Sequence, residues 1–427
     1  MVTAIGLDRA YKGGMPRLAF THAMACIAAA AGAGLALSTS AASAELRGTA
    51  SVGSSATHAR SDEFTEGMDK SPFGTASIDG RIALRVDAHP FGNIVAGIVA
   101  DADSRRDGVA DIQEAWIGWN PVPQSPWRTR LKAGAFFPVT NLEIGYDSIG
   151  WNAERTISSA AINSWLGEET RIIGVELAQQ WRGAMIDSPH TVTAKVGVFG
   201  ANDPAGTELA WRGWNLGGRV TGLFQNLRLP DLPVYRPDGA VPGQTRDVRV
   251  FREIDDRVGM YVALGYGHDE WLDISAMHYD NRGDPLRLAQ GQYTWHTRFD
   301  HLGVRLLLKD DWELLAQGML GRTRMGPDAV NVDFSSWYLL LSHGLGPGLA
   351  TLRHDHFQTT DRDVTPGDAN GESGYAWSLA YSVPLRDSLT LVTEVTSVVS
   401  TRAARSLIGK APRQSENSLS LELRLSF

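Results

Sequence analysis

The C-terminal segment of the chain alternates strictly between apolar and polar side chains. Its apolar positions are Leu419, Leu421, Leu423, Leu425 and Phe427, and its polar positions are Ser418, Ser420, Glu422, Arg424 and Ser426. A period of two predicts a β-strand with one apolar and one polar face. The same period recurs in 76–86, 127–137, 173–177, 192–198, 258–264, 375–381 and 389–395. Because a tilted strand of roughly ten residues crosses a bilayer, these runs predict an all-β transmembrane protein.

The connections between these runs come in two sizes that tend to alternate. The short ones cover 89–92, 267–270, 309–311, 344–348 and 384–387, and the long ones cover 54–74, 138–170, 325–333, 359–373 and 401–415. Short turns on one side and long loops on the other are typical of a closed antiparallel β-barrel in an outer membrane. Five tryptophans lie beside predicted turns, where an aromatic girdle would sit: Trp119, Trp127, Trp181, Trp271 and Trp312.

The number of candidate strands is odd, whereas closed bacterial barrels use even numbers. Either the run 46–53 is not a barrel strand, which leaves 16 strands, or 225–254 hides another one near Arg246–Glu253, which gives 18. In 293–308 the apolar positions change from odd to even, which predicts a β-bulge near Asp300.

The N-terminal segment reads as a secretory signal peptide. A basic start at Met15-Pro16-Arg17 precedes a run of apolar and small residues, and an Ala-x-Ala end closes it at Ala44. We therefore expect residues 1–44 to be a signal peptide with Met15 as the probable start, and 45–427 to be the exported barrel.

Composition excludes several kinds of site. The one cysteine, Cys26, lies inside the predicted signal peptide, so zinc, iron–sulfur and disulfide sites are not expected. His354 and His356 share one strand face and could form a metal site with His343. A solvated strand end is the better interpretation of these histidines. We expect no metal and no cofactor. A net charge of −8 argues against nucleic acid as a partner.

In architecture, residues 45–427 resemble the Gram-negative outer-membrane porins, and among these they resemble a general or phosphate-selective-type porin most. The resemblance rests on the signal peptide, the cysteine-free exported chain, the terminal strand ending in Phe427, and the long segment after an early strand. It implies a passive diffusion channel in the outer membrane for small hydrophilic solutes or ions; the slight preference for anions that we expect follows instead from a compact group of basic residues on the early strands. It also implies that Phe427 is an insertion signal read by the barrel-assembly machinery, that lipid surrounds the barrel, and that the protein is a homotrimer.

A barrel of this kind turns its polar strand faces toward the lumen. Basic residues on the early polar faces form a predicted ladder on one wall of the pore: Arg81, Arg85, Arg128, Arg130, Lys132, Lys195 and Arg219. Arginine keeps its charge and its fork geometry when crowded, as a pore constriction requires. The alternative is that these cations pair with neighbouring acids and merely fill a polar interior; the candidate acids are Asp79, Asp87, Glu114 and Glu176.

The long segment 138–170 is the predicted constriction loop. By the resemblance it folds into the channel and sets its acids opposite the basic wall; these acids are Glu143, Asp147, Glu154, Glu168 and Glu169. Within it, 158–167 predicts a short helix capped by Thr156 or Ser158.

Other interpretations remain open at this point. A soluble β-sandwich shows the same alternation but needs no terminal aromatic residue. An outer-membrane barrel enzyme of the phospholipase or protease type is the enzymatic rival, yet the sequence has no GxSxG elbow, and we expect no enzyme. A polysaccharide or solute export barrel would keep the basic ladder. The Pro-rich stretch 225–254 predicts a loop that packs at a subunit contact or folds over one mouth.

Overall fold

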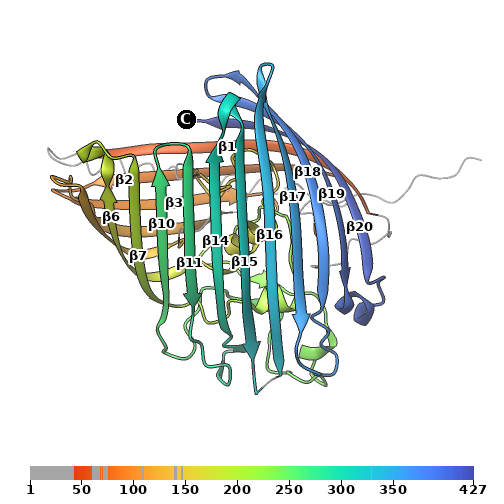
Figure 1. Cartoon of the computed structure of the whole chain (residues 1–427). Helices are drawn as coiled ribbons and strands as arrows, with labels where there is room; N and C mark the ends of the chain where they lie inside the picture. The colour runs from red at the N-terminus through yellow and green to blue at the C-terminus, as the bar shows by residue number, and fades with distance from the viewer. Residues whose placement is uncertain are drawn as a thin grey trace, which may run out of the picture.

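Strands that lie in hydrocarbon must pair all their backbone N–H and C=O groups, and a closed sheet achieves this. The computed structural model describes residues 43–59, 68, 70, 76–106, 110–138, 142–145, 148–327 and 329–427. Within them, sixteen antiparallel strands close one barrel, each paired with its neighbours along the chain (Figure 1). The predicted signal peptide lies outside the described residues, except for Ser43 and Ala44, which open the first strand.

The barrel strands differ in length. They are β1 (Ser43–Ala59), β2 (Ala76–His89), β3 (Ile94–Asp103), β4 (Ala110–Trp119), β5 (Trp127–Phe136), β6 (Ile172–Arg182), β7 (His190–Gly200), β10 (Gly259–His268), β11 (Leu272–Asp280), β14 (His296–Leu307), β15 (Glu313–Met325), β16 (Val330–Leu345), β17 (Gly348–Asp361), β18 (Glu372–Arg386), β19 (Leu389–Arg402) and β20 (Arg413–Ser426). Of these, β1 is the longest with 17 residues, and the barrel strands from β3 to β11 are among the shortest.

The strand count settles the choice between 16 and 18. Sixteen is right, but the predicted exclusion of the run 46–53 is wrong, because this run is part of β1, which pairs with both β2 and β20 and so closes the barrel. The stretch 225–254 holds no barrel strand, so the 18-strand alternative is wrong. Its two short strands, β8 (Leu227–Arg228) and β9 (Asp247–Val248), pair with each other inside the long connection between β7 and β10.

The predicted bulge near Asp300 is also wrong. β14 pairs with β11 and β15 in unbroken register through Asp300. Phe299 is 1% exposed and faces the interior, whereas Leu302 is 53% exposed and faces outward. The apolar residues change from odd to even positions because the inward-facing Phe299 packs against Trp165 inside the barrel. The register of the strand does not shift. Register breaks occur instead at Val99/Ala100 and at Pro384/Arg386.

The outer face of the barrel is apolar, as the alternation predicts. On β20, Leu419 is 55% exposed while the neighbouring Ser420 is 3% exposed. Near the short turns, the five predicted girdle tryptophans gather at one end of the barrel; Trp127 and Trp181 are register partners on β5 and β6. Among the described residues, no helix is long and apolar enough to cross a membrane.

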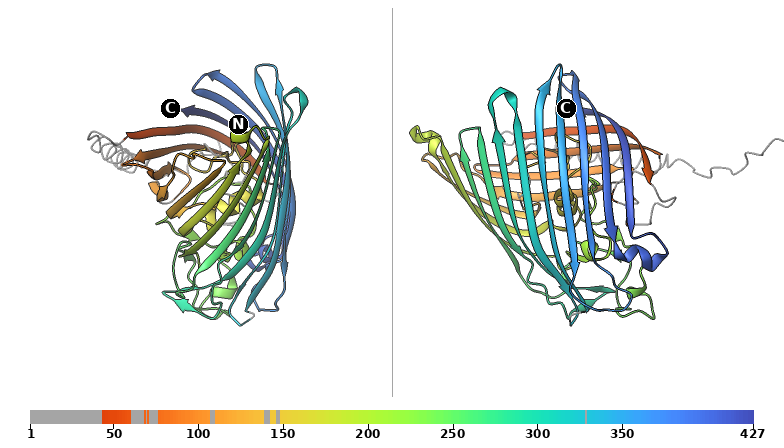
Figure 2. Two further views of the ribbon diagram at one scale, coloured as in Figure 1. Left: turned by 60° about the vertical axis from the view of Figure 1, so that its left-hand side comes forward. Right: turned by 45° about the vertical axis from the view of Figure 1, so that its right-hand side comes forward.

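Two long connections fold into the barrel from the end opposite the short turns, which is the lower end in Figure 1 (Figures 1 and 2). The segment between β5 and β6 carries α2 (Ala161–Glu169), whose residues are all buried. The segment between β7 and β10 carries α3 (Thr207–Trp211) and η2 (Pro233–Tyr235). The remaining short elements are η1 (Gly183–Ile186), β12 (Leu288–Ala289), β13 (Gln292–Tyr293), η3 (Lys309–Asp311) and η4 (Ala403–Ile408).

The two connections build two apolar clusters. One joins α2 to inward-facing aromatic residues of the wall, with Trp165 packed edge-on against Phe299 and Phe334. The second lies at the long-loop end and joins Trp211 to the Pro-rich stretch through Tyr235. The Pro-rich stretch therefore packs over one mouth, one of the two positions that the sequence predicts for it.

Candidate functional site

The segment after β5 is fixed to the far wall of the barrel by a buried cluster of charges. Arg353 of β17 forms ion pairs with Glu143 of the loop at 2.5 Å and with Asp355 of its own strand at 2.8 Å, and all three side chains are unexposed. Arg353 also donates to the carbonyl of Ser158 at 2.7 Å. Because both carboxylates share one guanidinium, this cluster holds the loop in one position against β17.

Carboxylates from distant segments also cap α2. The backbone N–H of Ala160 donates to Glu143 at 2.9 Å, and that of Ala161 donates to Asp355 at 3.2 Å. The positive end of a helix favours such anions. No side chain caps the helix locally, so the predicted start at 158 and the predicted caps Thr156 and Ser158 are wrong. The structural reason is that the caps come from elsewhere in the fold.

The far end of α2 is anchored in the same way. Glu168 pairs with Arg212 and accepts from Asn215 Nδ2 at 2.8 Å. Glu169 accepts from Trp165 Nε1 at 2.6 Å and from the backbone N–H of Glu208 at 2.9 Å, at the start of α3. Burial raises the pKa of Glu169 to about 7. The two inward connections are thus joined through these carboxylates.

Three of the predicted constriction acids therefore do not face the pore. Glu143, Glu168 and Glu169 are at most 1% exposed and bind other parts of the protein. Their prediction as acids opposite a basic wall is wrong, because an inward loop needs its own buried charges satisfied first. Glu154 has a side chain that is 40% exposed and pairs with Arg155 at 2.8 Å. Asp147 lies outside the described residues.

Four of the predicted ladder residues lie together on the inner wall of β5 to β7. Arg128, Arg130 and Lys132 occupy successive inward positions of β5, and Lys195 lies two strands away, at the level of Arg130. All four are partly exposed inside the barrel. Arg128 donates to Asn120 Oδ1 at 2.7 Å.

Acids on the same wall offset part of this charge. Lys132 lies 3.7 Å from Glu114 and above the rings of Trp116 and Phe136. Glu176 is its register partner on β6 and accepts from the Tyr261 hydroxyl at 2.6 Å. The predicted pairing of ladder cations with neighbouring acids therefore holds for Lys132. On β2, Arg85 pairs in the same way with Asp87 at 2.7 Å.

The other two ladder predictions are different. Arg81 on β2 has a side chain that is only 9% exposed; it donates to Gly150 O and Asn152 Oδ1 and lies 3.5 Å from Asp101. It anchors the inward loop and does not face the pore. Arg219 is exposed in the connection between β7 and β10, so it is not on a barrel strand.

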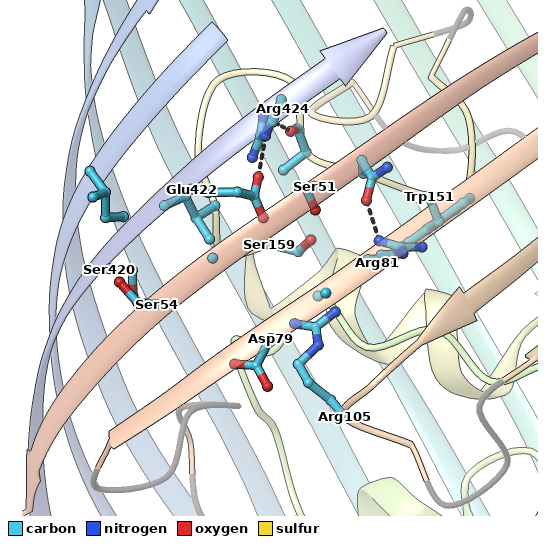
Figure 3. A pocket seen from close by; sticks show the side chains of 17 residues that line it. Ser51, Ser54, Asp79, Arg81, Arg105, Trp151, Ser159, Ser420, Glu422 and Arg424 are labelled. Carbon is cyan, nitrogen blue, oxygen red and sulfur yellow. Dashed lines mark hydrogen bonds and ion pairs between the residues drawn. The ribbon is translucent and has the colours of Figure 1, made fainter. Parts of the chain in front are cut away.

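A small cavity of about 40 Å³ remains beside Arg81, between the inward loop and the wall of β20, β1 and β2. Figure 3 shows Arg81 beside Trp151, and Arg424 beside Glu422 on the neighbouring wall. Arg424 donates to the carbonyl of Ala153 at 3.0 Å and to that of Thr156 at 2.6 Å. The cavity is therefore a gap between anchors of the loop.

Several residues that anchor the inward loop are not predicted from the sequence, including Arg353, Asp355 and Glu394. Glu394 of β19 accepts from the backbone N–H of Ile157 at 2.7 Å. A signal for them existed, because they are charged residues at lumen-facing positions of strands whose alternate positions are apolar. Lys70, in the connection between β1 and β2, was also missed; it pairs with Glu372 at 2.5 Å.

Phe427 completes the barrel seam. Its backbone N–H donates to Gly48 O at 3.0 Å, and the N–H of Gly48 donates to Phe427 O at 2.7 Å. The aromatic ring covers Gly48 so closely that a Cβ added there would lie 2.4 Å from Phe427 Cζ. The terminal residue therefore packs on the first strand.

No protein-family model matches the sequence, and no curated protein matches it. Solved structures do match the fold. The outer membrane channel DcaP of Acinetobacter baumannii aligns with a TM-score of 0.53 and 9% identity, over 91% of this chain and 99% of that one. OmpT, an outer membrane protein of Vibrio cholerae, aligns as a loop-deletion mutant with a TM-score of 0.51 and 7% identity, over 91% of this chain and 100% of that one. At these identities the likeness shows the fold, which is that of Gram-negative outer-membrane porins.

Proposed function

We propose that the protein is an outer-membrane channel for the passive diffusion of small hydrophilic solutes, with a modest preference for anions. The single observation that carries this proposal is a closed sixteen-stranded barrel whose outer face is apolar and whose interior is charged. Inside it, a wall of partly exposed charged side chains faces the inward loop, which is fixed in place. A barrel with only a structural role and a packed interior would not keep cationic side chains partly exposed inside it. The likeness to a protein described as an outer membrane channel supports it.

The preference for anions follows from the charges of the β5–β7 wall. Arg128, Arg130, Lys132 and Lys195 stand against two carboxylates, Glu114 and Glu176. The excess is positive, and a low-dielectric surround strengthens its effect on a passing ion. Size selection comes from the inward loop, which Arg353 and Glu394 hold against the opposite wall.

The remaining assignments follow from the same proposal. Residues 1–44 direct export through the inner membrane, the short turns face the periplasm, and the long loops face outward. Phe427 serves as the insertion signal for the barrel-assembly machinery, and the protein assembles as a homotrimer. The mass of the detergent-solubilised protein, measured by light scattering, tests the last assignment.

Single-channel recording of the refolded protein in a planar bilayer tests the proposal. We expect steady open steps, and under a salt gradient a reversal potential with the sign of anion preference. A correctly folded barrel that conducts nothing would contradict the channel function and favour an export or enzymatic barrel. A reversal potential of the opposite sign would contradict only the role of the basic wall.

A further inference from the structure

The outer face of β11, β14, β15 and β16 changes from apolar to charged toward the long-loop end. On β15 the outward positions are Leu314, Ala316, Gly318 and Leu320, followed by Arg322 and Arg324. The neighbouring strands change at the same level, with His278 on β11, Arg298 and Asp300 on β14, and Asp333 on β16. We call these charged residues, together with Arg362, the outer charged row. These strands stand side by side in Figure 1.

The row lies where the polar part of an outer leaflet would begin. Trp312, the residue before β15, marks the short-turn end of the apolar face, and Arg322 on β15 marks its other end. At about 3.4 Å per residue this stretch measures roughly 34 Å along the strand, or about 25 Å in height at the usual tilt of barrel strands. That height equals the apolar band of an outer-membrane barrel, so the row meets lipid head groups.

Five members of the row line a groove of about 520 Å³: His278, Arg298, Asp300, Arg322 and Asp333. Asp333 accepts from the Nε atoms of two arginines, Arg322 at 2.5 Å and Arg362 at 2.8 Å, and within the described part of the chain their remaining guanidinium N–H groups have no other partner. His278 pairs with Asp300 at 2.8 Å. Among the residues that the structure describes, none pairs with the guanidinium of Arg298, which is exposed at the groove.

Below the groove lies an apolar surface suited to acyl chains. Leu320, which lines the groove, is 62% exposed, and Trp337 on the adjacent strand is 40% exposed. Cations at head-group level above an apolar surface are complementary to an anionic lipid, and the planar guanidinium suits the oxygens of a phosphate.

We propose that the outer charged row binds the phosphorylated head group of an outer-leaflet glycolipid, lipid A, with Arg298 and Arg322 as its phosphate ligands. This inference rests on the proposed outer-membrane location. It adds a specific lipid partner to a surface that the channel function leaves unused, and it needs no conduction through the barrel.

Native mass spectrometry of the detergent-solubilised protein, titrated with bisphosphorylated lipid A, tests this inference. We expect the double variant R298Q/R322Q to bind lipid A at least tenfold more weakly than the wild type, since two charge-assisted contacts are lost. The control variant R228Q changes an exposed arginine of the β7–β10 connection that pairs with Asp247, and it should bind like the wild type. Dephosphorylated lipid A should bind the wild type as weakly as the phosphorylated lipid binds the double variant.

Two results would overturn the proposal. Equal binding of phosphorylated and dephosphorylated lipid A by the wild type would show that the phosphate does not contribute to binding. This comparison uses the wild type alone, so it holds even if the double variant fails to fold. Complete competition by millimolar inorganic phosphate would assign the groove to a free anion. Because the titration is done in detergent, its failure is distinguishable from a silent channel in a bilayer.

Discussion

At the scale of single residues, the interior of the barrel depends on buried charges that are satisfied in groups. Arg353 forms ion pairs with Glu143 and Asp355 and donates to the carbonyl of Ser158. None of the three charged side chains is exposed. Removing one member of such a group leaves uncompensated charge, which costs about 3–5 kcal/mol. The loop position therefore depends on this arginine more than on any local cap.

The substitution R353M tests that dependence. It leaves Glu143 and Asp355 without their shared cation, so the loop should detach from β17. We expect noisier single-channel steps with a higher mean conductance and a lower urea midpoint. The exposed Arg386, beside the β18–β19 turn, offers the control R386M, which should change neither quantity. Unaltered steps in R353M would show that other contacts alone hold the loop.

Asp368, in the connection between β17 and β18, gives a prediction about pH. Its Oδ1 accepts from Trp211 Nε1 at 3.1 Å and from Asn370 Nδ2 at 2.8 Å, whereas its buried Oδ2 has no partner among the described residues. Burial raises the pKa of Asp368 from 3.8 to about 7. The folded chain therefore holds this proton more tightly, and the resulting stability is complete below pH 3.8 and lost as the pH rises to about 7.

The isosteric substitution D368N removes this titration. The variant should equal the wild type in stability near pH 4 and exceed it by on the order of 2–4 kcal/mol at pH 8. Urea midpoints measured at unit steps between pH 4 and pH 8 check this expectation. The matched variant D238N changes an exposed acid of the β7–β10 connection and should follow the wild type at every pH. A difference between D368N and wild type that is constant with pH would refute the titration.

At the scale of elements, β5 carries the selectivity that we propose. Replacing Arg128 and Arg130 with glutamate reverses two inward charges of the wall while leaving the outward face of the strand unchanged. R128E/R130E should therefore move the reversal potential toward cations. R228E/R236E makes the same change of net charge on exposed residues outside the barrel strands and should have a much smaller effect. Equal shifts in both variants would mean that total charge, and not the wall, sets selectivity.

The strands could be predicted from the sequence because lipid imposes one rule on every outward position. Leu419 and Leu302 obey it, so the outer face follows from the period of two. Inward positions obey no single rule. Phe299 is apolar because it meets Trp165, and Glu143 is acidic because it meets Arg353, which lies far away in the sequence. The basic wall on β5 was found because its residues are close together in the chain, whereas the partners of the loop acids were not.

At the scale of the whole molecule, the barrel exists only if its first and last strands meet. β1 and β20 pair from Thr49/Ser426 to Ala59/Glu416, and the Phe427–Gly48 contact extends this seam by one more residue pair. The ring of Phe427 fills the space that a side chain at position 48 would need. A terminal aromatic residue can therefore act in two ways, as a signal read during assembly or as a packed part of the closure.

The variants F427A and G48V separate these two roles. If the ring is part of the closure, both variants should refold in detergent with a lower yield of the compact, heat-modifiable form, because each removes the same contact from one side. If Phe427 is only a signal, F427A should refold like the wild type in detergent and fail only in cells, and G48V should retain the signal. F91A changes a 68% exposed aromatic residue at the β2–β3 turn and is the control. We expect the closure result, and normal refolding of both variants would exclude it.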